Sequence, residues 1–200
     1  METPTQPRRI ARLAGVWYAA FIVLSILGGA FQDTADTTVS RLSLVATVAG
    51  YACLLIVAAT LFRLFRQVDG LLALLMLAFA ATGAAINFPT ARGHGELISA
   101  VFWWLWLVPL GLLILRSELI PRFFGALLLV GCLFHLMDFG ARLFAVGGLP
   151  QVEQGPAVAL TSVGVVWRGV CYAVEVIAEF SLLAWLLVKG VRVRADRSAS

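Results

Sequence analysis

Long apolar runs alternate with short polar connections along most of this chain. Each run holds about as many residues as the roughly 17 to 25 that a helix needs to cross a bilayer. Helix is the expected form, because an isolated strand would leave backbone hydrogen-bonding groups unpaired in hydrocarbon, and the runs lack the alternation of a barrel strand. The pattern predicts an all-α fold: one membrane domain, a polytopic bundle of six transmembrane helices. The predicted spans cover about residues 13–31, 42–62, 71–88, 97–115, 123–145 and 163–188.

Composition places most of these residues in lipid. Hydrophobic residues make up 61% of the 200 and charged residues only 13%, which leaves too little polar surface to coat a water-soluble globule. The first run could instead be a signal peptide. It is longer than the usual apolar core of roughly 7 to 15 residues, however, and Trp17 and Tyr18 near its start are typical of a membrane interface.

Basic residues are distributed unevenly between the two ends of the predicted helices. Most of the 15 flank the ends that include both termini: Arg8, Arg9, Arg12, Arg63, Arg66, Arg116, Arg122, Lys189, Arg192, Arg194 and Arg197. Since basic residues beside transmembrane helices are retained in the cytoplasm, both termini are predicted to be cytoplasmic, with residues 189–200 as a basic tail. We interpret the net charge of +4 as the same signal and as contact with the lipid bilayer, not with nucleic acid.

Ionisable side chains inside the last two spans are the first candidates for function, because a charge at the centre of a membrane helix costs roughly 2.5 to 3.5 kcal/mol. At 100° per residue, His135, Asp138 and Arg142 share one helix face. A second face carries Arg168, Tyr172, Glu175 and Glu179. His135, Asp138 and Glu175 lie at similar depth, roughly 20 Å from the cytoplasmic ends at 1.5 Å per residue, with both arginines nearer the outer side.

Acid–base chemistry is the role expected of Asp138, Glu175, Glu179 and His135. Glu175 and Glu179 are one turn apart, so one of them is expected to be protonated or matched by a cation. A proton donor held neutral in an apolar wall suits acid catalysis on a hydrocarbon-like substrate.

Aromatic and polar residues around these acids are the expected binding groups. Several tryptophans precede Pro109, which removes a helical hydrogen bond and predicts a kink. They cover more than one helix face, so at least one is expected to point into the bundle. The predicted substrate-binding set is Trp103, Trp104, Trp106, Tyr172, Arg142, Arg168, Asn87 and Tyr51.

Three functions are consistent with this arrangement. The first is an internal cavity that binds a lipophilic small molecule, with isomerisation or cyclisation of an isoprenoid-like substrate as its chemistry, in an isomerase or a terpene-cyclase-like lyase. The second is a non-catalytic scaffold or accessory protein whose buried charges are structural ion pairs. The third is a small transporter, for which six spans give little room unless the protein forms a homo-oligomer. No cofactor or metal is expected, because the two histidines, His94 and His135, lack ligand spacing.

Four segments of the chain carry a family resemblance. They are RRIARLAGVWY from Arg8 to Tyr18, LFRLFR from Leu61 to Arg66, IPRFFGALL from Ile120 to Leu128, and AEFSLLAWLLVKGVR from Ala178 to Arg192. Together they resemble a bacterial membrane family catalogued as domain of unknown function number 4386. The resemblance implies a multi-helix protein of the bacterial plasma membrane, without assigned catalytic residues.

Overall fold

The computed structural model describes residues 5–31, 34–87, 101–102, 104–145 and 162–191, with side chains except at positions 5, 87, 138, 141–145, 162–165, 167–168, 171–172 and 175. These residues form six helices and no strand, so the all-α prediction is confirmed for the described part of the chain. The helices are α1 Thr5–Ala30, α2 Thr37–Phe65, α3 Gly70–Asn87, α5 Leu107–Arg116, α6 Arg122–Ala145 and α7 Ser162–Val188.

Two of these helices are long and apolar enough to cross a membrane, judged by length and composition over the described residues. They are Gln6–Ala30 and Thr37–Phe65. The other apolar stretches in the described part are shorter, at 10–17 residues. Large apolar side chains are nevertheless exposed along the outward faces of most helices. Examples are Leu13, Val23, Leu42, Val45, Leu71, Phe123, Val166 and Ile177.

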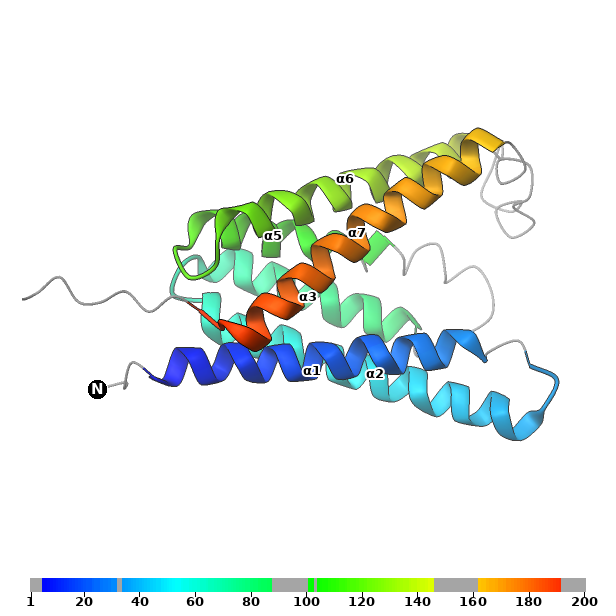
Figure 1. Cartoon of the computed structure of the whole chain (residues 1–200), viewed down its shortest axis with the longest axis horizontal. Helices are drawn as coiled ribbons and strands as arrows, with labels where there is room; N and C mark the ends of the chain where they lie inside the picture. The colour runs from blue at the N-terminus through cyan, green and yellow to red at the C-terminus, as the bar shows by residue number, and fades with distance from the viewer. Residues whose placement is uncertain (1–4, 32–33, 88–100, 103, 146–161, 192–200) are drawn as a thin grey trace, which may run out of the picture.

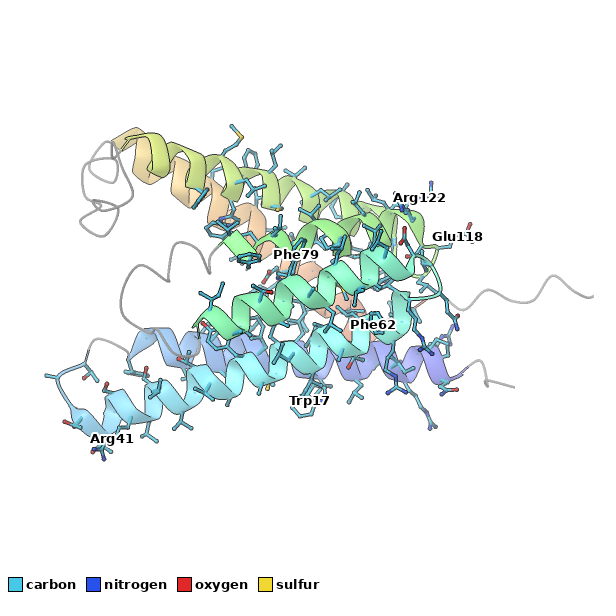
Figure 2. All side chains as sticks on the ribbon, turned by 180° about the vertical axis from the view of Figure 1, so that it is seen from behind. Trp17, Arg41, Phe62, Phe79, Glu118 and Arg122 are labelled. Carbon is cyan, nitrogen blue, oxygen red and sulfur yellow. The ribbon has the colours of Figure 1, made fainter. Side chains whose placement is uncertain are left out.

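The helices pack in chain order into a closed ring. Each helix contacts the one before it and the one after it, and α7 returns to contact α1 (Figure 1). The ring is tight at one end only. In both views the α1–α2 hairpin and the α6–α7 hairpin converge where α1 begins and α7 ends, and diverge toward their other ends (Figures 1 and 2).

The contact between α1 and α7 depends on a few residues at the converging end. A Cβ atom at Gly15 would come within 3.1 Å of Leu187, so the leucine packs directly on the glycine backbone. Arg12 Nη2 donates to the backbone carbonyl oxygen of Val188 at 3.4 Å, which satisfies an acceptor in the last turn of α7. Gly190 then turns the chain with φ of +67°, a conformation that glycine adopts without steric cost.

Helix starts are capped by aspartates where the connections are short. Asp36 Oδ1 accepts hydrogen bonds from the amides of Thr38 and Val39 at 2.7 and 3.1 Å, so α2 begins at Thr37. Asp69 Oδ1 accepts from the Leu72 amide at 3.0 Å at the start of α3. Each aspartate satisfies amides that the helix itself leaves without an acceptor.

The fourth predicted span, 97–115, corresponds to more than one helical segment in the described residues. Residues 101–102 and 104–105 are helical, a turn lies at Trp106, and α5 begins at Leu107. Pro109 has no amide hydrogen to donate to the carbonyl of Leu105, one turn earlier. The interruption therefore lies where the proline removes a helical hydrogen bond.

Small residues allow α5 and α6 to approach closely. A Cβ atom at Gly125 would meet the carbonyl oxygen of Gly111 at 2.6 Å, and a Cβ at Gly111 would meet the carbonyl oxygen of Gly125 at 3.0 Å. The obstacle is backbone in both directions, so a larger residue would force the helices apart. Membrane helices commonly pack through such small-residue contacts, because close backbone approach increases van der Waals contact.

We expect Gly125→Ala to destabilise the protein by about 1–3 kcal/mol, the usual range for overpacking. The measurement is the thermal unfolding midpoint of the purified chain in detergent. Gly140→Ala is the matched control on the same helix, because a Cβ there meets no atom of the described residues within 4 Å. Equal midpoints for the two variants would contradict the close-contact explanation.

Candidate functional site

The clearest meeting of predicted site residues is between Trp104 and His135. Their rings stack with centroids 4.4 Å apart and planes 13° apart. His135 comes from α6 and is 2% exposed, whereas Trp104 lies just before α5 and is half-buried. Cys132, one turn before His135, donates its Sγ hydrogen to the carbonyl oxygen of Trp104 at 3.3 Å, which attaches the two segments at the same level.

Trp106 lies deeper in the ring than Trp104. It is 1% exposed, and its ring meets that of Tyr18 on α1 edge-on, with centroids 6.3 Å apart. Phe102 instead contacts Phe79 of α3, with centroids 6.2 Å apart (Figure 2 labels Phe79). Aromatic side chains from α1, α3 and the segment before α5 thus pack against one another across the ring.

The side chains of most of the other predicted site residues lie outside the described part of the structure. The backbones of Asn87, Asp138, Arg142, Arg168, Tyr172 and Glu175 belong to α3, α6 and α7, but their side chains are not described; Trp103 is not described at all. Glu179 on α7 and Tyr51 on α2 are half-buried. The described side chains therefore bring together His135 and Trp104 from the predicted set.

A second feature lies at the converging end of the ring. A cavity of about 1050 Å³ opens between the start of α1, the α2–α3 connection and the α5–α6 connection. Four arginines line it, and we call it the arginine basin: Arg63, Arg66, Arg116 and Arg122. Among the described lining residues the only carboxylate is that of Glu118, so the lining has a positive excess. Figure 2 places Glu118 and Arg122 at this end and Arg41 at the opposite end.

Asp69 connects two of the segments around the arginine basin. Its Oδ2 pairs with Arg116 Nη1 at 2.5 Å, while its Oδ1 caps α3. The pKa of the Asp69 carboxyl lies below its usual value, first because the Leu72 amide donates to the carboxylate and also because Arg116 is adjacent. Partial burial acts in the opposite direction and is outweighed. The start of α3 and the end of α5 are held together by this one side chain.

Comparison with known proteins gives one match. The family described as Domain of unknown function (DUF4386) matches residues 85–190, just over half of the chain. The chain belongs to this family. No curated protein and no solved structure matches it.

The DUF4386 match includes Trp104, His135 and the later half of the arginine basin, Arg116 and Arg122. The resembling segment at Ile120–Leu128 falls within it, and the segment at Ala178–Arg192 does so except for its last two residues. The segments at Arg8–Tyr18 and Leu61–Arg66 lie outside it. Arg63 and Arg66 therefore reach the basin from a part of the chain that the family match does not include.

Asp69 and the arginine basin are the features that sequence reasoning missed. An aspartate before a glycine and a long apolar run is a helix-start signal, so the sequence alone can predict that Asp69 caps a helix. The sequence does not predict that Asp69 pairs with Arg116, because the two residues are 47 positions apart and no local pattern relates them. The sequence pattern of the arginines indicates only topology, because their convergence on one cavity depends on how the start of α1 packs with two connections.

We expect the charge of Asp69 to stabilise the fold above its usual pKa of about 3.8, and this contribution to be lost as the pH falls through the lowered folded-state pKa. Asp69→Asn keeps a capping oxygen but removes the charge. The unfolding midpoint of the wild type should exceed that of D69N at neutral pH, and the gap should close in acid. A gap that persists unchanged well below pH 3.8 would argue against the ion pair.

Proposed function

We propose that this chain is a multi-pass protein of the bacterial plasma membrane, with six spanning helices and both termini in the cytoplasm. Exposed apolar side chains on the outward faces of the ring support the proposal, because soluble monomers rarely expose so large an apolar surface. The concentration of arginines at one end supports the orientation. In this arrangement the converging end faces the cytoplasm.

The proposed function is binding of a lipophilic small molecule inside the ring beside Trp104 and His135, with acid–base isomerisation or cyclisation of an isoprenoid-like substrate as its chemistry. The observation that carries it is the stack of the buried His135 ring on the half-buried Trp104 ring. An imidazole is the side chain whose ordinary pKa is nearest neutrality, which suits it to proton transfer. An indole face beside it offers a surface on which an apolar ligand stacks or a carbocation is stabilised.

The acids proposed for this chemistry lie near the stack along the helices. Position 138 is one turn beyond His135 on α6, and position 175 lies 13 residues from the last residue of α7. His135 lies 13 residues from the first residue of α6. At 1.5 Å per residue, His135 and position 175 are therefore at similar depth, about 20 Å from the converging end. Asp138, Glu175 or Glu179 would donate or accept the proton, with Tyr172, Arg142 and Arg168 as neighbouring binding groups.

A non-catalytic scaffold is the second candidate. Its support is that the described ion pair, Asp69 with Arg116, is structural: it ties two connections together. If the acids inside the last two helices pair with Arg142 and Arg168 in the same way, they would hold the bundle and carry out no chemistry.

The topology is tested by cysteine labelling in intact cells, with Cys53, Cys132 and Cys171 replaced by serine. We expect a membrane-impermeant thiol reagent to label T34C from outside and to label E118C only after the membrane is opened, because the two positions lie at opposite ends of the helices. Labelling of E118C in intact cells would overturn the orientation. Labelling of both positions in intact cells would overturn the span assignment.

The ligand proposal is tested by mass spectrometry of lipophilic molecules that copurify with the wild type and with D138N, E175Q and W104A. We expect each variant to fold and to lose most of the bound molecule, or to lose its turnover once the molecule is known. R41Q is the control, because it neutralises an exposed charge on α2 that belongs neither to the proposed site nor to the arginine basin. Retention of the molecule by all three site variants would contradict the proposed site. Unfolding of D138N and E175Q, with full retention by W104A, would favour the scaffold.

A further inference from the structure

The arginine basin concentrates positive charge that the described residues do not balance. Four arginines and one glutamate line it, and one of the arginines, Arg116, is already paired with Asp69. The partial charges of the helix ends do not explain why the charge of the cavity is positive. The starts of α1 and α6 and the ends of α2 and α5 all border it, so their opposite partial charges largely offset each other. The arginine side chains therefore give the cavity its positive charge.

The other three arginines bring like charges together around the cavity, although the end of α2 individually favours Arg63 and Arg66. Arg63 and Arg66 are three residues apart at the end of α2, where like charges on neighbouring positions of a helix surface repel. Arg122 is the first residue of α6, at the positive end of that helix, where a cation is disfavoured. Such an arrangement is stabilised by an anion that contacts several guanidinium groups at once.

Guanidinium groups indicate which anion fits best. Arginine donates two parallel hydrogen bonds to phosphate or carboxylate oxygens, and it recognises phosphate better than lysine where geometry matters. The floor of the basin is less polar than its rim, since Leu64 and Ile120 are buried there. Ser117, which also lines the basin, is buried and donates to the carbonyl oxygen of Ile114 at 3.2 Å. A charged rim over an apolar floor matches an amphiphile with a phosphate head.

We infer that the arginine basin binds the phosphate group of an anionic amphiphile, held by Arg63, Arg66 and Arg122. A volume of about 1050 Å³ is far more than a single phosphate fills and is in the range that holds a whole small ligand. Two sources share this chemistry: the headgroup of a membrane phospholipid, and a water-soluble phosphorylated molecule. A lipid source rests on the proposed membrane topology, because it requires the converging end to lie at a bilayer surface. Phosphate recognition by the basin does not depend on that topology.

The test is native mass spectrometry of the full chain, purified in detergent, with added phosphatidylglycerol or phosphatidylcholine. We expect the wild type to retain phosphatidylglycerol preferentially, and R122Q to retain it about fivefold more weakly. The double variant R63Q/R66Q should retain it about 25-fold more weakly, since each basic residue contributes a factor of about five. The matched control is R41Q, which removes the same charge from the same helix at the opposite end (Figure 2).

The source of the phosphate is resolved by competition with glycerol 3-phosphate and inorganic phosphate. Displacement of phosphatidylglycerol only at millimolar concentrations or above would assign the basin to lipid. Displacement at micromolar concentrations would assign it to a soluble phosphorylated molecule, with the same arginines responsible. Equal retention of phosphatidylglycerol by R41Q, R122Q and R63Q/R66Q would overturn the inference. Because this assay is carried out in detergent, its outcome is independent of the labelling experiment that tests the topology.

Discussion

The contact between the end of α7 and the start of α1 is the interaction on which the rest of the structure depends. The other helix pairs in the ring are neighbours in the chain, and their connections bring them together. The contact of α7 with α1 joins segments that are 176 residues apart at Arg12 and Val188. It depends on the close approach that Gly15 permits and on a guanidinium that satisfies a carbonyl at the end of α7. It closes the ring that the contacts between successive helices leave open, together with the contact of Tyr18 on α1 with Trp106.

This closure acts at one end of the ring, which gives the two ends different chemistry. Where the helices converge, the α2–α3 and α5–α6 connections lie close enough for the arginines beside them to share one cavity and for Asp69 to reach Arg116. Toward the other ends the two hairpins diverge (Figure 1). The stack of Trp104 on His135 lies between these regions, within the part of the chain that matches the family. The arginine basin needs α2 as well, which lies outside that match.

The two sites depend on different physical effects. The Trp104–His135 stack relies on burial, because an imidazole that is 2% exposed is removed from water and packs against an indole face. The arginine basin relies on exposure to water, because its guanidinium groups remain hydrated. The range over which they attract an anion is limited by the salt concentration, which screens the charges. A protein with both features offers an apolar interior for the body of a ligand and a charged end for a phosphate.

Apolar run lengths determined the helical class and the approximate positions of the helices, because the period and length of such runs are local properties. The sequence also carried the aspartate caps of α2 and α3 and the interruption before Pro109, since each of these depends on residues within one turn. Which tryptophan points inward, which arginines meet, and that Asp69 pairs with Arg116 were decided only by tertiary structure. These contacts join residues far apart in the chain, and they form only once the ring of helices has closed.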